Sequence, residues 1–473
     1  MLFNSFAFLI FLLVVFIIYW SSNNSLRLQN TFLAIASYIF YGWWDYRFLI
    51  LIFISTVVDY FVALGMERYA DKRSRKSLLG ISIVFNLGLL GYCKYANFFI
   101  DSFVDAFLFA GFDIDSPTLN IILPVGISFY TFQTLSYSID VYRRDIKANN
   151  DFLAFLVYVS FFPQLVAGPI ERSTKLLPQI LNKRIFSYQE AALGMKQILW
   201  GLFKKMVIAD NCAPYVDQIF NSSESLHGST LLLGAVLFSF QIYGDFSGYS
   251  DIAIGVSRLF GIKLSRNFNN PYFSRDIAEF WRKWHISLSS WFKDYVYIPL
   301  GGSAKNRMTS IRNIFIIFLV SGFWHGANWT FIAWGAFHSI LYLPLFLLKR
   351  NRKNISEHPR INDLLPVLKT YLLVCIGWIF FRAENITQAS HMVSEILSGS
   401  LFSPIQVSLR VLYIVALIVI LIVLEWLNRK HEFTLEKLGS NWNTTVRWSF
   451  YSTIILLIAW FAKTGTSFIY FQF

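Results

Sequence analysis

About a dozen apolar runs recur along the chain, and they constrain its fold more than any other feature of the sequence. Hydrophobic residues make up 55% of the 473 residues and charged residues only 15%, against roughly 25% charged in soluble domains. A soluble core cannot bury this much apolar surface, because such cores stop growing at roughly 250–300 residues. Disorder is excluded as well, since disordered chains are poor in hydrophobic residues. We therefore expect lipid to be the solvent of this chain.

The apolar runs predict transmembrane helices. A helix of roughly 17–25 apolar residues crosses a bilayer, and several of the runs are shorter, so the sequence predicts roughly ten to twelve spans. It contains no Gly/Ser linker, low-complexity tract or internal repeat, and we expect residues 1–473 to form a single membrane domain. The runs cover residues 2–20, 31–43, 48–65, 77–92, 121–139, 152–168, 231–243, 311–323, 329–348, 367–381, 411–427 and 448–462.

Basic residues outnumber acidic residues by 41 to 28 and gather in short clusters between the apolar runs. Such clusters are typical of cytoplasmic loops under the positive-inside rule. The net charge of +13 therefore indicates membrane topology rather than nucleic-acid binding. The clusters are Arg68, Lys72, Arg73, Arg75 and Lys76; Arg143, Arg144 and Lys147; and Lys349, Arg350, Arg352 and Lys353.

Three further segments, residues 97–112, 188–209 and 276–297, mix charged and apolar residues. They are too polar to face lipid and too apolar to be ordinary loops. We expect them to form interfacial helices, or helices buried in a bundle around a polar cavity. In the third segment, helical spacing places Trp281, Trp284 and His285 on one face, which would point the imidazole into a bundle.

His325 is the first candidate for chemistry, because it lies between two apolar runs in SGFWHGANWT (residues 321–330). An ionisable side chain at membrane depth is costly and marks a candidate functional site. Imidazole is also the side chain best suited to move a proton near neutral pH. The alternative is a structural histidine that donates to a neighbouring helix. For His338, and for His285 taken alone, the structural interpretation is favoured.

A second candidate is QIYGDFSGYSD (residues 241–251), in which Asp245, Tyr249 and Asp251 follow directly on an apolar run. Irregular polar backbone at this depth is tolerated only where it lines a cavity or is buried in protein.

Several common chemistries have no motif in the sequence. It lacks GxxxxGK[ST], GxGxxG, GxSxG and HExxH, and its three cysteines have no metal-ligand spacing. These absences argue against an ATP-driven pump, a familiar redox flavoenzyme, an α/β-hydrolase and a bound metal. Histidine-dependent group transfer within the membrane is the chemistry that remains.

Five segments, in this order, span most of the chain. They are PVGISFYTFQTLSYSIDVY (124–142), FFPQLVAGPIER (161–172), QIYGDFSGYSDIAIG (241–255), FWRKWHISLSSWFKDYVYIPLGG (280–302) and GFWHGANWTFIAWG (322–335). Together they resemble the membrane-bound O-acyltransferase (MBOAT) superfamily, and within it the bacterial branch that O-acetylates alginate and peptidoglycan.

The resemblance implies an all-α polytopic integral membrane protein. Roughly eleven transmembrane helices would surround a central tunnel, with interfacial and re-entrant helices beside them. By motif match, the family's central histidine is His325, and a second position, Asn in many eukaryotic lipid acyltransferases, is His285. We expect His325 to act as the base, and His285 to orient the acceptor or donate to the developing charge. The residues expected to line the tunnel or bind substrate are Asp245, Tyr249, Asp251, Trp324 and Asn328.

The resemblance also implies substrates and partners. No cofactor is expected to be bound; acetyl-CoA would enter as the acyl donor from the cytoplasm. Phe468-x-Tyr470-x-x-Phe473 is similar to a C-terminal acyl-carrier motif of relatives, with Tyr470 as a transient acyl carrier. An aromatic belt at the membrane interface is the alternative. An extracytoplasmic SGNH-type acetyltransferase would pass the acetyl group to a polysaccharide.

The expected function is thus a membrane O-acetyltransferase of the bacterial inner membrane, multi-pass and embedded in lipid, acting on alginate, another exopolysaccharide or peptidoglycan. A relative that transfers D-alanyl or fatty acyl groups is the alternative within the family. A small-solute transporter is the alternative from another class. A transporter would be expected to show repeats or paired intramembrane charges, and it would leave both histidines without a role.

Overall fold

The computed structural model describes residues 1–22, 25–114, 119, 121–303, 306–355, 358–463 and 468–469. The structure is 73% helix, and none of the regular elements in the described residues is a strand. This confirms the all-α membrane fold. The chain divides into two compact units, Met1–Ala191 with Val256–Ser265 (unit 1) and Ala192–Gly255 with Arg266–Phe473 (unit 2). The single membrane domain expected for residues 1–473 stays a prediction.

Five helical stretches of the described chain are long and apolar enough to cross a membrane. Two further apolar helices are shorter. The total of roughly eleven spans stays a prediction. The five stretches are Phe48–Arg68, Lys72–Phe109, Gly228–Leu259, Trp329–Leu347 and Ile361–Arg382, and the shorter two are Phe6–Ser21 and Val411–Leu427.

The span expected at residues 152–168 is wrong. The run forms two short helices, α7 (Phe152–Ser160) and α8 (Phe162–Leu165). The backbone leaves the helical region at Phe161 (φ −51°, ψ 106°), and Pro163, which has no N–H to donate, lies in the first turn of α8. Nine residues of helix reach only about 13 Å, less than half the thickness of the hydrocarbon core.

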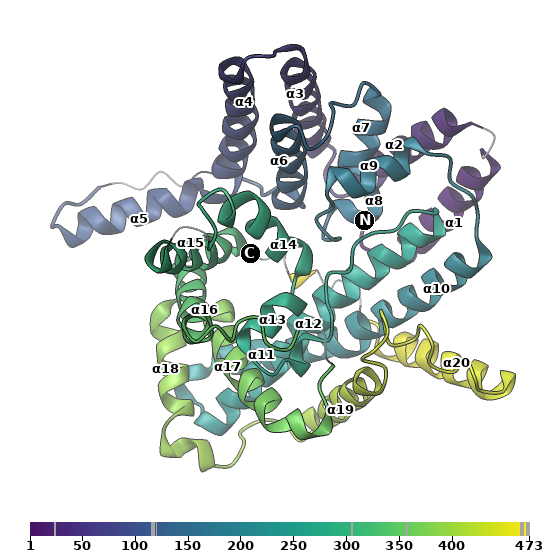
Figure 1. The fold of residues 1–473 in the computed structure, drawn as a ribbon. Coiled ribbons are helices and arrows are strands. Elements are labelled where there is room, and N and C mark those ends of the chain that lie inside the picture. The colour runs from purple at the N-terminus through teal and green to yellow at the C-terminus, as the bar shows by residue number, and fades with distance from the viewer. Residues whose placement is uncertain are drawn as a thin grey trace. The chain divides into compact units, whose positions relative to one another are not determined.

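In unit 1, three helices pack side by side around a buried carboxyl group (Figure 1). Asp59 of α3 accepts hydrogen bonds from Ser82, from Asn86 at 2.8 Å and from Ser138 at 2.8 Å. A carboxyl group removed from water needs such donors, so these contacts cross-link the three helices. The helices are α1 (Phe6–Ser21), α2 (Leu26–Gly42), α3 (Phe48–Arg68), α4 (Lys72–Leu90), η1 (Gly91–Tyr95), α5 (Ala96–Phe109), α6 (Ile127–Arg143), α7, α8 and α9 (Ser173–Leu181).

A π-helical turn bends the longest helical stretch of unit 1. Lys72–Phe109 would be about 57 Å long if straight, well beyond a hydrocarbon core of about 30 Å. The π-helix η1 lies between α4 and α5, and Figure 1 shows α5 turned away from the axis of α4. Such turns are a known cause of helix kinks. None of the residues of α5 is buried, in keeping with the interfacial helix predicted for residues 97–112.

In unit 2, glycines bring α12 (Gly228–Leu259) into backbone contact with α10 (Tyr188–Leu202). A Cβ atom at Gly248 would lie 2.7 Å from the carbonyl oxygen of Gly201, and one at Gly201 would lie 2.5 Å from that of Gly248. Small residues allow this close approach. The irregular backbone considered for residues 241–251 is therefore wrong: the segment is helical, and its glycines serve helix packing.

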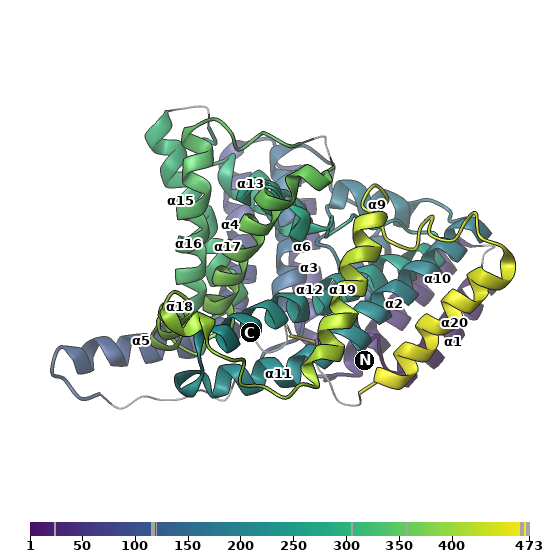
Figure 2. The same ribbon diagram turned by 90° about the horizontal axis from the view of Figure 1, so that it is seen from below.

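His325 ends α15, which forms a tight hairpin with α16. A Cβ atom at Gly335 would lie 2.3 Å from the carbonyl oxygen of Phe318. Figure 2 shows α15 and α16 beside α17. Unit 2 contains η2 (Phe203–Ala209), α11 (Asp210–Asn221), η3 (Ser223–Ser225), η4 (Pro271–Phe273), α13 (Ile277–Lys283), α14 (Ile286–Phe292), η5 (Lys293–Tyr297), α15 (Arg307–His325), α16 (Trp329–Leu347), η6 (Ile361–Asp363), α17 (Leu364–Arg382), α18 (Ile386–Ile396), η7 (Gly399–Phe402), α19 (Val411–Leu427) and α20 (Thr444–Phe461), and most of α10 and α12.

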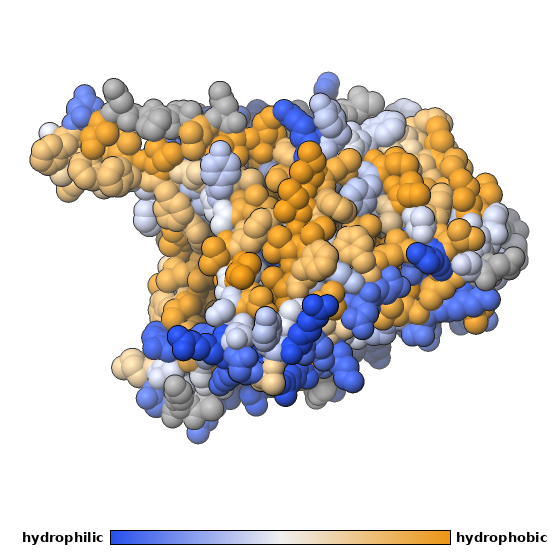
Figure 3. All heavy atoms as spheres, turned by 90° about the horizontal axis from the view of Figure 1, so that it is seen from above, coloured by the Kyte–Doolittle hydropathy of each residue, from blue (hydrophilic) through white to orange (hydrophobic). Residues whose placement is uncertain are grey.

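Apolar side chains point outward from many helices, and Figure 3 shows them as broad orange areas. Examples are Phe6 and Ile17 of α1 and Leu456 and Trp460 of α20, each more than 60% exposed. Soluble monomers rarely expose large contiguous apolar surfaces. These side chains are placed as lipid contact requires.

We expect Gly248→Ala to destabilise the protein by about 1–3 kcal/mol, because the added methyl group meets backbone of α10. Gly80→Ala is the matched control, since its Cβ atom would meet nothing within 4 Å, and it should be neutral or stabilising by up to about 1 kcal/mol. Thermal unfolding in detergent measures both. Equal melting temperatures for the two variants would contradict the assignment of this contact.

Candidate active site

His285 lies at a break between α13 and α14. Its backbone is left-handed (φ 44°, ψ 55°), a conformation that is uncommon for residues other than glycine and is found at functional sites. The prediction that Trp281, Trp284 and His285 share one face of a continuous helix is therefore wrong. Two backbone hydrogen bonds to residues 267–269 replace the helical pattern here, and helical periodicity cannot reveal such partners.

Asn267 holds this turn. Its carbonyl oxygen accepts from the N–H of Ile286 at 2.9 Å. Its side-chain Oδ1 accepts from the N–H of Ser287 at 3.2 Å and from Oγ of Ser287 at 3.0 Å, and lies 3.1 Å from Nδ1 of His285. Because this oxygen accepts a backbone N–H, the amide orientation is set, and Nδ1 of His285 must donate to it.

The protonation state of His285 follows from its surroundings. Burial lowers the pKa of its imidazole to about 3, so the ring is neutral at physiological pH. Since Nδ1 carries the proton, Nε2 is the basic nitrogen of the ring.

The structure brings the two predicted catalytic histidines together. The ring centroids of His285 and His325 are 6.5 Å apart, and both side chains are at least 97% buried. Trp324, Trp334 and Phe381 place their rings 4.9, 5.3 and 5.3 Å from the ring of His325. Aromatic walls of this kind restrict water, which favours proton transfer between fixed groups.

The other predicted site residues have different surroundings. Trp324 lies next to both histidines, 6.0 Å from the ring of His285. Asn328 caps α16: its Oδ1 accepts from the N–H of Thr330 at 2.9 Å, and its Nδ2 donates to the carbonyl of Glu384 at 2.9 Å. Its role in substrate binding stays a prediction. Tyr470 lies outside the described residues.

His338 is buried on α16, and its Nδ1 accepts from the indole N–H of Trp281 at 3.3 Å. This contact is in keeping with a structural histidine.

Asp245 and Asp251 of α12 are each paired with a lysine of the π-helix η2. Nζ of Lys205 lies 2.6 Å from Asp245, and Nζ of Lys204 lies 2.6 Å from Asp251. Tyr249, between the two carboxylates in sequence, is buried. Segment 188–209 was predicted to be interfacial or buried, and the burial of both lysines supports the second option. The signal for the pairing was two adjacent lysines in an apolar stretch, GLFKKMVIA.

A pocket of about 400 Å³, including space open to solvent, lies beside Asn267. Lys204 and Asp251 line it, together with Arg266 and the pair formed by Tyr243 and Glu425, in which the hydroxyl donates at 2.9 Å. Sequence reasoning missed Asn267, Arg266 and Glu425. The first two lie in a polar connecting stretch, SRNFNN, and Glu425 is a single carboxylate in an apolar run, and neither pattern by itself indicates a site.

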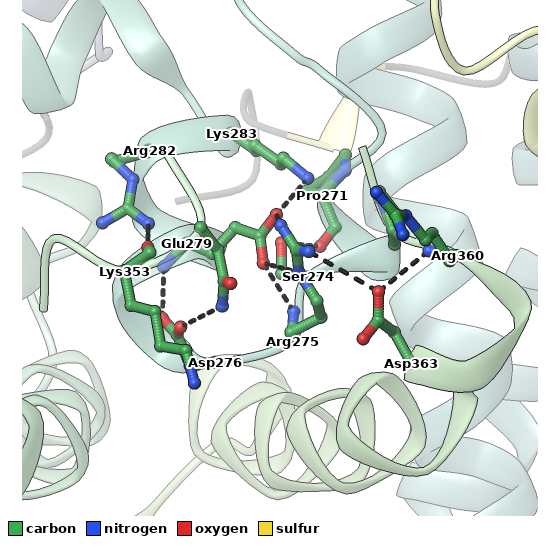
Figure 4. Close-up of polar contacts among 12 residues, drawn as sticks. Pro271, Ser274, Arg275, Asp276, Glu279, Arg282, Lys283, Lys353, Arg360 and Asp363 are labelled. Carbon is green, nitrogen blue, oxygen red and sulfur yellow. Dashed lines mark hydrogen bonds and ion pairs between the residues drawn. The ribbon is translucent and has the colours of Figure 1, made fainter. Parts of the chain in front are cut away.

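An ion cluster fixes α13, which leads directly into the turn at His285 (Figure 4). Glu279 is buried and lies 3.1 Å from Arg275 and 2.7 Å from Nζ of Lys283; Asp363 lies 3.5 Å from Arg275. Burial acts to raise the pKa of Glu279, but hydrogen bonds from Arg275 and the charge of Lys283 lower it below 4.5 overall. Glu279 is therefore ionised at neutral pH.

Arg282 ties α13 to the loop that carries the basic cluster from Lys349 to Lys353. It donates to the carbonyls of Asn351 at 2.6 Å and Lys353 at 2.9 Å. Burial and surrounding positive charge lower the pKa of His358 nearby. The cations that act on it are Lys283, Arg429, Lys430 and Arg266. These four cations, which are distinct from the loop cations Lys349–Lys353, are called the basic cluster of unit 2.

The MBOAT, membrane-bound O-acyltransferase family matches residues 143–383. The chain is 41% identical over 401 residues to the probable alginate O-acetylase AlgI of Pseudomonas aeruginosa, covering 84% of this chain and 75% of the relative. It is 38% identical over 421 residues to the peptidoglycan O-acetyltransferase of Helicobacter pylori, covering 82% and 78%. It is 30% identical over 284 residues to the teichoic acid D-alanyltransferase of Bacillus subtilis, covering 57% and 71%.

The chain belongs to the membrane-bound O-acyltransferase family. The resemblance noted in the sequence is thereby confirmed, and the MBOAT protein is a multi-pass membrane protein and an O-acyltransferase. It is thus an enzyme rather than a small-solute transporter.

We expect Asn267→Ala to slow acyl transfer by about tenfold or more, because His285 loses the acceptor that fixes its tautomer and its turn. Ser287→Ala removes a different hydrogen bond to the same Oδ1 and should remain close to the wild-type rate. Rates are measured in proteoliposomes at equal protein content. If the two variants were equally active, Asn267 would not control His285.

Proposed function

We propose that this protein transfers acetyl groups from cytoplasmic acetyl-CoA across the bacterial inner membrane for O-acetylation of an extracytoplasmic polysaccharide. Alginate, another exopolysaccharide and peptidoglycan are the candidate acceptors. The pair of buried histidines, with ring centroids 6.5 Å apart, carries the proposal. The names of the Pseudomonas and Helicobacter relatives support acetyl as the acyl group.

His325 acts as the base. An attacking hydroxyl gives its proton to His325, its oxygen bonds to the thioester carbonyl carbon, and the carbon–sulfur bond breaks. The coenzyme A thiolate then takes the proton from His325. Because Nδ1 of His285 donates to Asn267, Nε2 of His285 is an acceptor. It can accept the single O–H of the acceptor while the acceptor binds, before that hydroxyl turns its proton to His325 in the transfer step. This geometry favours orienting the acceptor as the role of His285, over donation to the developing charge.

The pocket beside Asn267 and the basic cluster support acetyl-CoA as the donor. Two adjacent residues line this pocket: Asn267, which contacts His285, and Arg266, which belongs to the basic cluster. Cationic side chains recognise phosphate groups. Arg282 connects α13 to the loop containing Lys349 and Lys353, which the positive-inside rule assigns to the cytoplasm. Acetyl-CoA would therefore reach the histidines from the cytoplasm.

On the acceptor side, Tyr470 serves as the transient carrier. Its hydroxyl takes the acetyl group in the His325 step, which gives an activated phenol ester. A sugar hydroxyl then attacks this ester and regenerates the phenol, in a step assigned to an extracytoplasmic SGNH-type acetyltransferase. The acyl-carrier motif at residues 468–473 supports this order of transfer.

We expect His325→Ala to reduce release of coenzyme A thiol from acetyl-CoA by at least about a hundredfold, because the attacking oxygen keeps its proton. His227→Ala, at an exposed position, is the matched control and should retain the rate. Purified protein is assayed with a thiol reagent. Full activity in His325→Ala would refute His325 as the base. Faster thiol release from palmitoyl-CoA than from acetyl-CoA would show that the enzyme transfers a fatty acyl group and not acetyl.

We expect Lys430→Ala to raise KM for acetyl-CoA by about two- to fivefold with kcat unchanged, because an exposed cation of the basic cluster is lost. Lys437→Ala removes a neighbouring exposed cation outside that cluster and should have no effect. Equal KM values for both variants would contradict phosphate recognition by this cluster.

A further inference from the structure

The C-terminal segment enters the interior of unit 2. Phe468 and Ile469 are 1% and 3% exposed, although they lie within five residues of the end of the sequence. The ring of Phe468 packs 4.8 Å from that of Tyr249 and 5.9 Å from that of Phe246, both on α12. Holding a short segment in one place costs conformational entropy, so specific contacts must tie it down.

A hydrogen bond from the backbone provides the tie. The N–H of Ile469 donates to Oδ2 of Asp245 at 2.5 Å. The other oxygen of Asp245 is paired with Lys205, whose Nζ also contacts Asp210 at 2.7 Å. A hydrogen bond to an ionised carboxylate is roughly twice as strong as one between neutral groups. The contact with Lys205 holds the side chain of Asp245 in place, so its carboxyl group is a fixed acceptor.

A second contact holds the chain just before this point. Nζ of Lys463, beyond the end of α20, donates to the carbonyl of Asp210 at 3.1 Å. Lys205, Asp210 and Asp245 form one buried group of charged side chains, called the Lys205 ion cluster here. Lys463 and Ile469 thus both contact residues of the Lys205 ion cluster, the first at the backbone of Asp210 and the second at the side chain of Asp245.

The docked segment lies close to the catalytic histidines. Phe246 follows Asp245 on α12, and its ring is 4.7 Å from that of His285. The same ring contacts Phe468. One aromatic side chain thus separates the C-terminal segment from His285, so docking at Asp245 sets where this segment meets the site.

We propose that Asp245, held by Lys205, is a positioning residue that docks the C-terminal segment at Phe468 and Ile469 against the histidine site. The purpose of docking, delivery of an acyl-carrier hydroxyl, rests on the proposed function. The docking itself does not depend on it, because it stands on the hydrogen bond, the ion cluster and the burial of the two residues.

Two variants act on the hydrogen bond from opposite sides: one weakens the acceptor and the other removes the donor. Asp245→Asn removes the carboxylate, and Ile469→Pro removes the backbone donor. Ile469→Pro leaves the contacts among Lys205, Asp210 and Asp245 intact. Hydrogen–deuterium exchange of full-length protein in detergent reports on the C-terminal amides directly. In both variants we expect the amides of the C-terminal peptide to exchange at least about tenfold faster than in wild type. Asp251→Asn, whose carboxylate contacts Lys204 and Gln197, should leave this exchange unchanged.

Kinetics separate positioning from general damage. Both docking variants should lower kcat and leave KM for acetyl-CoA unchanged, because the donor pocket does not include Asp245 or Ile469. Unchanged C-terminal exchange in either variant would overturn the docking role. Tyr470→Phe tests the carrier separately. If this variant had wild-type exchange and wild-type activity, Tyr470 would not be the acyl carrier, and the docking role of Asp245 would still stand.

Discussion

The cost of burying ionised groups away from water governs the interior of this protein. Unit 2 meets that cost with directly paired charges: Lys204 with Asp251, and Lys205 with both Asp210 and Asp245. Removing one partner of such a buried pair costs about 3–5 kcal/mol, because the other charge is left without compensation. Lys204 and Asp251 line the pocket, and Asp245 and Asp210 contact the C-terminal segment. The same charged groups therefore stabilise the fold and lie next to the candidate site.

These ion pairs require an unusually close approach of two helices. The lysines lie on the π-helix η2, and two of their partners, Asp245 and Asp251, lie on α12. The two backbones can meet because glycines stand at the contact. A Cβ atom at Gly244 would lie 2.8 Å from the carbonyl oxygen of Lys204. Any larger side chain would push η2 away and lengthen the salt bridges beside it. Glycine packing and charge pairing are thus two aspects of one interface.

Much of the fold and part of the site could be predicted from the sequence, for identifiable reasons. The apolar runs predicted an all-α membrane protein, because their length reflects the bilayer. His285 and His325 were identified by motif, and the structure places their rings together. The helical face through His285 could not be predicted correctly, because Asn267, distant in sequence, ends that helix. In residues 241–251, composition suggested irregular backbone, since glycine serves turns and tight helix contacts equally.

The tautomer of His285 limits what the site can do. With Nδ1 committed to Asn267, a neutral ring offers one acceptor and no second donor. It can orient a hydroxyl, but it cannot donate to an oxyanion until it gains a proton, which its low pKa opposes. In the proposed reaction, negative charge on the thioester oxygen must therefore be stabilised by another group, or the proton released in the transfer must reach His285 early. The sequence motifs alone do not distinguish the protonation states of the two histidines. The hydrogen bond to Asn267 fixes that of His285.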